Sequence, residues 1–380
     1  MTDDLEQEID VYQTCLFLIE RGRAALLRSN FDMADKALDL VAQTMQEAPS
    51  RKTEVILPLA LCYRSLLERR RGNAAEAADL RTRATPLVEA IPLTEQSVPF
   101  HNLMLNALID LAEYRRAIPF CEQAIQMISD RNDPLALVDL LSREGLCYAR
   151  SGLKEHAAII LRAALKILRS FPGDPRLPAV LISLGNALRK SSPVEAEQLY
   201  KEAAAVHEAK AQMESATTAW INLGILCSEQ GLHTESLDYY KRALRVREGA
   251  PATPPDRIGS LLNNMANGYR RKGEFDEALR LVDRAIGTLK PSDGSLLASA
   301  YGTRGQILHD ANRDTEAVEW LQKSYAERQK ASSPDLDAII ENLEREIESL
   351  QRLGNTQEML AAEQRLAHAK TQRKKRPGSI

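Results

Sequence analysis

Two stretches decide the fold, WINLGILCSEQGLHTESLDYYKRAL (220–244) and LNNMANGYRRKGEFDEALRLVDRAI (262–286), and they repeat one pattern without a gap. In each stretch, apolar residues recur three and four positions apart before and after a glycine, which is Gly231 in the first copy and Gly273 in the second. Such spacing predicts a helix on either side of a tight turn. Each stretch is therefore expected to form a helical hairpin.

The same pattern continues over most of the chain with a period near 40 residues. One small residue marks each copy, and neighbouring markers are separated by 39 (157 to 196) to 43 (34 to 77) positions. The markers are Ala34, Ala77, Ala117, Ala157, Ala196, Ser236, Ala278 and Ala317. Repeated hairpins of this kind bury their apolar faces by stacking on one another. The sequence predicts an all-α fold, a right-handed α-solenoid (superhelix) of about eight to nine helix-turn-helix repeats.

The predicted domain organisation follows from where this pattern ends. Residues 1–330 are expected to form the tandem solenoid of about eight repeats. Residues 331–370 read as one more helical pair, whose charged surface suits a terminal cap because a solenoid must end in a polar face. Residues 371–380, which are basic, are predicted to be a disordered tail.

Composition and charge narrow the function classes. Over 380 residues the formal net charge is −3, which provides no overall field for nucleic acid, and no apolar run is long enough for membrane insertion. The five cysteines are widely spaced and contain no C-x-x-C pair, so we expect buried, reduced thiols and no metal site or cofactor. An acidic beginning, MTDDLEQEID, does not resemble a secretory signal, and a cytoplasmic location is expected.

The repeated positions resemble the tetratricopeptide repeat family, whose signature places Trp or Leu, Leu-Gly, Tyr, Gly, Ala, an aromatic residue and Ala along a hairpin. The resemblance covers roughly residues 8–330 and is strongest in 137–330. The period near 40 residues is longer than the roughly 34 residues usual in this family. In this respect the chain is similar to kinesin light chain and to the adaptors named after a Leu-Gly-Asn triplet, which Leu184-Gly185-Asn186 reproduces. This resemblance implies a protein-binding scaffold whose concave face is lined by the first helix of each hairpin.

Transferring the family's inward positions onto this chain gives a candidate peptide-binding groove rich in asparagine and arginine. Its residues are Asn102, Asn106, Arg143, Asn186, Arg189, Lys190, Asn222, Asn263, Asn264, Asn267, Arg270, Arg271 and Gln306. An amide side chain both donates and accepts hydrogen bonds, so it can pair with a peptide backbone, and arginine adds recognition of carboxylates. The resemblance thus implies an acidic peptide segment of a partner protein, although Asp110, Glu229 and Asp310 also face inward.

The alternatives differ in function class. The sequence contains no phosphate-binding loop, G-x-S-x-G elbow or H-E-x-x-H pair, so no catalytic activity is predicted. A peptide-sensing regulator, which would switch an effector protein by a change in superhelix pitch, is the second reading. A self-assembling protein that pairs through its helix near residues 338–353 is the third, and a monomer is favoured over it.

Overall fold

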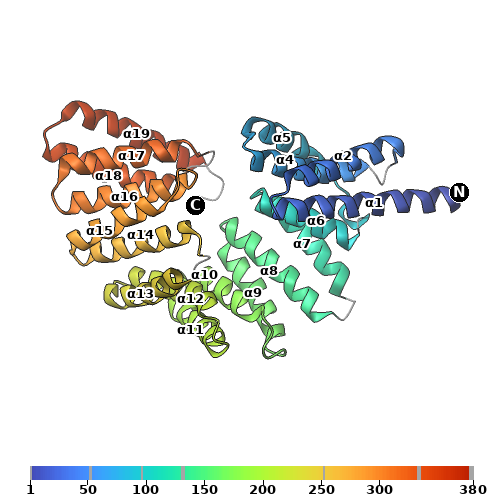
Figure 1. Cartoon of the computed structure of the whole chain (residues 1–380), viewed down its shortest axis with the longest axis horizontal. Helices are drawn as coiled ribbons and strands as arrows, with labels where there is room; N and C mark the ends of the chain where they lie inside the picture. Colours follow the sequence, from blue (N-terminus) through green and yellow to red (C-terminus); the bar gives the residue numbers. More distant parts are fainter. Residues whose placement is uncertain are drawn as a thin grey trace. The chain divides into compact units, whose positions relative to one another are not determined.

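A computed structural model describes residues 2–50, 54–95, 97–129, 133–250, 253–331 and 335–375. These residues form 18 α-helices and no strand, so the all-α prediction is confirmed (Figure 1). The chain divides into two compact units, residues 1–187 and 188–380, and each unit is described by itself.

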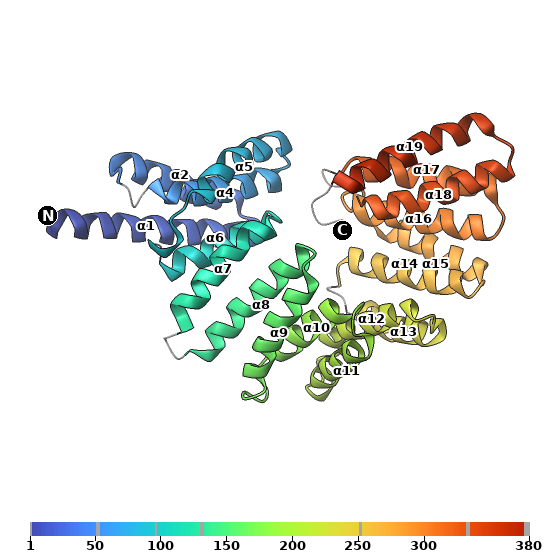
Figure 2. The ribbon, with the colours of Figure 1, turned by 180° about the vertical axis from the view of Figure 1, so that it is seen from behind.

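Unit 1 is a stack of four helical hairpins, and the two helices of each hairpin pack against each other (Figure 2). The pairs are α1 (Thr2–Leu27) with α2 (Phe31–Glu47), α4 (Ile56–Arg71) with α5 (Ala74–Glu89), α6 (Val98–Asp110) with α7 (Tyr114–Ser129), and α8 (Pro134–Arg150) with α9 (Lys154–Leu168). A short 3-10 helix, η1 (Leu93–Glu95), precedes α6, and α10 (Leu177–Leu188) ends at the boundary of the unit.

Unit 2 begins with α11 (Pro193–Ala209) and continues with four further hairpins. These are α12 (Met213–Glu229) with α13 (His233–Gly249), α14 (Pro255–Arg271) with α15 (Phe275–Thr288), α16 (Gly294–Asp310) with α17 (Asp314–Gln329), and α18 (Leu336–Arg352) with α19 (Thr356–Lys375). The first helices α12, α14, α16 and α18 also contact one another in this order. They therefore form one continuous wall, and the predicted solenoid of helix-turn-helix repeats is confirmed within each unit.

Left-handed backbone conformations end the first helix of most hairpins. At the turn after α12, Gly231 has φ +79°, its N–H donates to Ser228 O, and the next N–H, of Leu232, donates to Cys227 O. This pair of bonds satisfies carbonyl groups that the helix end would otherwise leave free, and glycine adopts the conformation without strain. The equivalent turns hold Ser29, Gly72, Ala112, Gly152, Gly273, Asn312 and Gly354, all with positive φ.

The small marker residues lie on the helices α2, α5, α7, α9, α11, α13, α15 and α17. All eight markers are buried, and Ser236 in addition donates a hydrogen bond from Oγ to Gly224 O at 2.7 Å. A β-carbon on Gly224 would lie 2.4 Å from Cε1 of Tyr240, so only glycine lets this ring pack against α12. The period near 40 residues is thus the period of close contact between helices.

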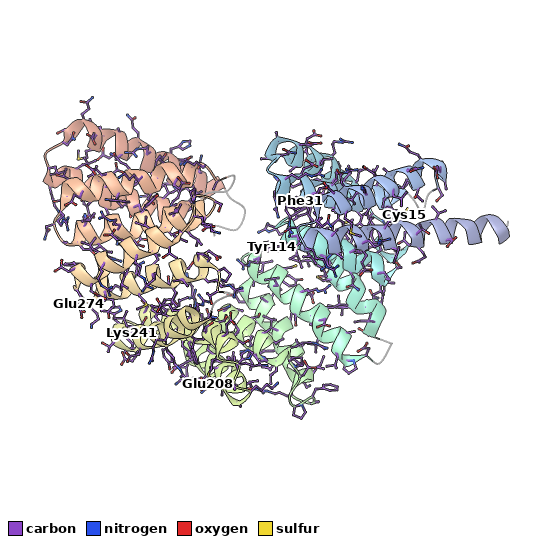
Figure 3. The ribbon with its side chains drawn as sticks, in the orientation of Figure 1. Cys15, Phe31, Tyr114, Glu208, Lys241 and Glu274 are labelled. Atoms are coloured by element: carbon purple, nitrogen blue, oxygen red, sulfur yellow. The ribbon has the colours of Figure 1, made fainter. Side chains whose placement is uncertain are left out.

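The five cysteines are buried, as predicted, and form no disulfide bond among the described residues; Cys15 lies in the middle of α1 (Figure 3). Among the described residues, no three His, Cys, Asp or Glu side chains are grouped to hold a metal ion. In the described part of the chain, no helix combines the length and hydrophobicity needed to cross a membrane.

The prediction of a disordered tail from residue 371 is wrong for residues 371–375, since α19 continues to Lys375. Its last turns are held against α18 by the buried Ala369 and by an ion pair, in which Arg373 Nη1 lies 3.0 Å from Asp337 Oδ1. Residues 376–380 lie outside the described residues.

Candidate peptide-binding cavity

Helix α14 carries the amides at the centre of the candidate site because its two faces differ in polarity. Leu262, Met265 and Ala266 are buried against the core of unit 2, whereas Asn264 and Asn267 are half-buried on the opposite face. Pro255 begins the helix, where its missing N–H costs no hydrogen bond. The apolar stripe therefore directs a row of asparagines away from the core.

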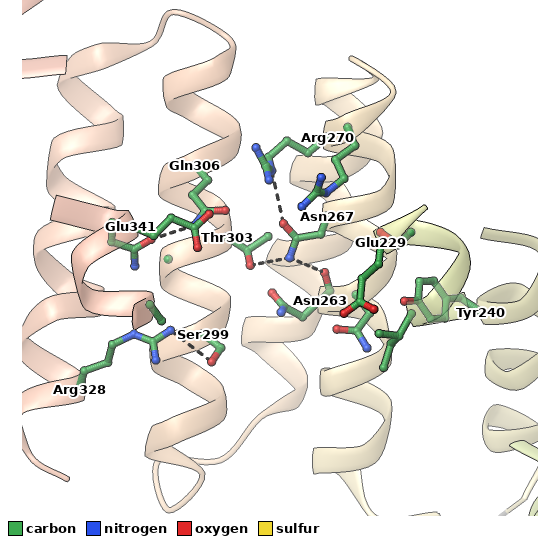
Figure 4. Close-up of a pocket in the computed structure, with 17 residues that line it drawn as sticks. Glu229, Tyr240, Asn263, Asn267, Arg270, Ser299, Thr303, Gln306, Arg328 and Glu341 are labelled. Carbon is green, nitrogen blue, oxygen red and sulfur yellow. Dashed lines mark hydrogen bonds between the residues drawn. The ribbon is translucent and has the colours of Figure 1, made fainter. Parts of the chain in front are cut away.

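These asparagines line a cavity of about 330 Å³ on the wall of first helices (Figure 4). The cavity draws residues from α12, α14, α16 and α18, with additional side chains from the second helices α13 and α17. Its lining consists of Ile225, Ser228, Glu229, Tyr240, Asn263, Asn264, Asn267, Arg270, Arg271, Ser299, Gly302, Thr303, Gln306, Arg328, Ala338, Glu341 and Asn342. The surface is therefore rich in amide and hydroxyl groups.

Hydrogen bonds fix part of this lining. Asn267 Nδ2 donates to Thr303 Oγ1 at 3.1 Å, and Asn267 Oδ1 accepts from Arg270 Nε at 3.3 Å. The guanidinium of Arg270 also forms an ion pair with Asp310 of α16. Asn263 Oδ1 is buried and has no hydrogen-bond partner among the described residues. The site thus combines a fixed framework with one buried acceptor that the described residues leave unpaired.

A second network connects α16 to α18 at the other side of the cavity. Gln306 Nε2 donates to Asn342 Oδ1 at 2.9 Å, and Asn342 Nδ2 donates to Ser324 Oγ at 3.1 Å. Gly302 leaves room for this network, because a β-carbon there would lie 2.6 Å from Asn342 Nδ2. The cavity wall consequently depends on the last hairpin.

The arginines of the predicted groove are partly neutralised by carboxylates of the next repeat. The side chain of Arg270 is 8% exposed, and burial lowers its pKa despite the neighbouring charge of Asp310. Arg189 Nη1 lies 3.4 Å from Glu229 Oε1. Arg271, by contrast, is exposed at the cavity. These pairs limit how basic the surface is.

The structure brings six predicted site residues together in the cavity: Asn263, Asn264, Asn267, Arg270, Arg271 and Gln306. In the same unit, Asn222 is half-buried on α12 outside the cavity lining, and Lys190 is exposed before α11.

The remaining predicted residues lie in unit 1: Asn102, Asn106, Arg143 and Asn186. Asn102 Oδ1 accepts a hydrogen bond from Arg143 Nη1 at 3.4 Å, whereas Asn186 is exposed on α10.

Sequence reasoning missed several lining residues, above all Arg328, Glu341 and Asn342. Arg328 lies on a second helix, and the other two belong to the hairpin that was predicted to be only a cap. The inward positions transferred from the family lie on the first helices of matched repeats. They therefore could not predict these three residues.

Comparisons with known proteins agree with this architecture. Two sequence profiles described as "Tetratricopeptide repeat" match residues 186–253 and 257–330. The curated "Protein KINESIN LIGHT CHAIN-RELATED 2" of Arabidopsis thaliana is 24% identical over 243 residues, which are 60% of this chain and 36% of that protein. The chain thus spans about a third of the length of this relative.

Two solved structures show a similar fold at low sequence identity. Aspartyl phosphate phosphatase F from Bacillus subtilis has a TM-score of 0.60 at 14% identity, covering 97% of this chain and 95% of its own. NprR in complex with its cognate peptide NprX has a TM-score of 0.51 at 11% identity, covering 80% and 87%. Together with the two matched profiles, the stacked hairpins identify the chain as a tetratricopeptide repeat protein that resembles kinesin light chain.

Proposed function

We propose that this protein is a non-enzymatic scaffold, which binds a peptide segment of a partner protein in the cavity of unit 2. The observation that carries the proposal is the row of amides from Asn263 to Asn267, continued by Gln306, along a cavity of about 330 Å³. Amides of this kind pair with the backbone of an extended segment without demanding one side chain. Repeat proteins commonly use their concave surfaces for binding.

The bound segment is proposed to be acidic. Arg271 is exposed at the cavity, and a cation at that place attracts carboxylates. Arg270 contributes less to the binding of an acidic peptide than its sequence position implies, because its charge is already neutralised by Asp310.

A binding role is favoured over catalysis by the chemistry of the lining. Within the described residues, the cavity carries amides, hydroxyls, arginines and the carboxylates of Glu229 and Glu341, but no histidine or cysteine that could act with them as a nucleophile or base. The similarity to an aspartyl phosphate phosphatase concerns the fold, at 14% identity. The buried free thiols favour a reducing compartment, which supports a cytoplasmic location.

A peptide-display selection with the full chain tests the proposal. We expect wild-type protein to enrich a defined set of peptides, and Asn264→Ala combined with Arg271→Glu to abolish their binding. The matched control is Arg245→Glu, which changes an exposed arginine of α13 outside the cavity lining and should leave binding intact. Equal loss in the control, or retained binding in the cavity variant, would place recognition elsewhere.

A second candidate function is a peptide-sensing regulator, favoured by the similar fold of NprR, whose solved structure holds a peptide. In that case a selected peptide should change the small-angle scattering profile of the protein, whereas a passive scaffold should keep its profile. Light scattering on the same sample would distinguish a monomer from a self-assembled form.

A further inference from the structure

The guanidinium of Arg328 lies in the cavity wall with most of its hydrogen-bonding capacity unused. Arg328 Nη2 donates to Ser299 Oγ at 3.4 Å, a long contact that Figure 4 shows at the cavity. Its Nε is buried and has no hydrogen-bond partner among the described residues. Arg328 also lines a second cavity of about 320 Å³, near Gly294 at the start of α16. A guanidinium donates through five N–H bonds, so the Nη groups of Arg328 can donate further hydrogen bonds to a ligand.

Nearby carboxylates do not form an ion pair with Arg328 in the described structure. Glu341 is paired with Arg345, at 3.0 Å between Oε1 and Nη1. Asp335 caps α18 by accepting a hydrogen bond from Ala338 N at 3.1 Å. Burial lowers the pKa of Arg328, and these two carboxylates only partly oppose that effect.

Arg328 is half-buried, and a cation in this position without an ion-pair partner is unfavourable, because it has lost part of its hydration without gaining an opposite charge. A carboxylate that enters the cavity would supply the missing charge and form a charge-assisted hydrogen bond to the guanidinium. Arg270 has no such need, since its side chain is already paired with Asp310. The buried Arg270 and the half-buried Arg328 therefore differ in their capacity for a ligand.

We infer that Arg328 binds a carboxylate of the bound peptide, and that this residue of a second helix sets the preference for an acidic ligand more than Arg270, which is already paired, or Arg271, whose exposed charge is screened by water. The inference rests on the proposed function, because it assumes that a peptide occupies the cavity. The carboxylate can belong to an aspartate or glutamate side chain or to the end of the peptide. Both sources offer the same two oxygen acceptors.

Three pools of fluorescent peptides of about nine residues, which reach roughly 30 Å when extended, test the inference on the full chain. All pools are degenerate and free of aspartate and glutamate elsewhere. The first has one glutamate and an amidated end, the second has glutamine and an amidated end, and the third has glutamine and a free carboxyl end. Retention by wild type and by Arg328→Gln, Arg328→Lys and Arg271→Gln is compared.

We expect wild type to retain the first or the third pool over the second by about tenfold or more, as a charge-assisted hydrogen bond provides. Arg328→Gln should remove this preference while the second pool is retained as before. Arg328→Lys should keep part of the preference for the carboxylate, and Arg271→Gln should keep most of this preference. Which pool is retained distinguishes a side-chain carboxylate from a terminal one.

The outcomes distinguish the role of Arg328 from peptide binding itself. A preference that persists in Arg328→Gln, or wild type that retains all three pools equally, overturns the role of Arg328 and leaves peptide binding intact. Failure of wild type to retain any pool overturns peptide binding itself. Thermal unfolding adds an independent readout: a purely structural arginine predicts that Arg328→Gln lowers Tm, whereas removal of a half-buried charge without an ion-pair partner predicts an unchanged or higher Tm.

Discussion

Glu144 provides a quantitative test of how tightly the helices of unit 1 pack. This residue of α8 is 4% exposed, and its burial, together with the charge of Glu122, raises the pKa of its carboxyl group to about 7. The ordinary pKa of the side chain is 4.5. Folded protein therefore binds more protons than unfolded protein between these two values.

The free energy of unfolding falls as the pH rises from about 4.5 to about 7, and the loss is fully present above that window. A rise of the pKa of this size corresponds to about 3 kcal/mol at most, and partial hydration of buried charges reduces it, so we expect roughly 1–3 kcal/mol. Glu144→Gln removes the charge with little change of shape.

Hydrogen exchange of α8 in the full chain, at about pH 8 and about pH 5, measures the local opening free energy. Comparison of wild type and Glu144→Gln at one pH cancels the intrinsic exchange rates. We expect the variant to be more stable by roughly 1–3 kcal/mol at the higher pH and nearly equal to wild type at the lower pH. Glu155→Gln, at an exposed position of α9, is the matched control and should show no such difference. A variant that is less stable than wild type at the higher pH, or equally shifted at both pH values, would show that the carboxylate of Glu144 does not lose stability on ionising.

Three further substitutions test the packing and the electrostatics of unit 2. Gly224→Ala places a β-carbon 2.4 Å from Tyr240 Cε1, so we expect a loss of about 1–3 kcal/mol in urea unfolding, partly recovered by Tyr240→Leu in the same chain. Gly273→Ala forces a side chain onto φ +76°, and a loss of about 1 kcal/mol should appear as a lower urea midpoint. Asp310→Asn leaves the buried Arg270 unpaired, which should cost about 3 kcal/mol or more and lower Tm; Arg270→Met in the same chain should restore Tm. An unchanged Tm in the single variant Asp310→Asn would show that the pair is solvated.

The fold could be predicted from the sequence because one local requirement recurs. A small residue such as Ser236 or Ala278 is needed wherever two helices of a hairpin touch, and that need appears as a period near 40 residues. The amides of α14 could be predicted for a related reason: their positions follow once the buried face of the helix is known.

The ion pairs between consecutive repeats were not predicted from the sequence, although their residues are separated by the repeat period. Arg189 pairs with Glu229 and Arg270 with Asp310, and each pair is 40 positions apart. Equivalent positions of consecutive repeats lie side by side, so these ion pairs could have been expected from the spacing.

Arg328 is different, because it lies on a second helix and reaches the cavity beside the last hairpin. Its role depends on how α16, α17 and α18 pack, which no spacing in the sequence encodes.

Site-specific photo-crosslinking shows where the peptide binds. A benzoylphenylalanine is placed at Ile225 in the cavity lining or at Arg245 on the second helix α13, and a peptide from the display selection is added. We predict a covalent adduct from position 225 that excess unlabelled peptide suppresses, and none from position 245. An adduct from position 245 alone would contradict the assignment of the cavity as the peptide-binding site.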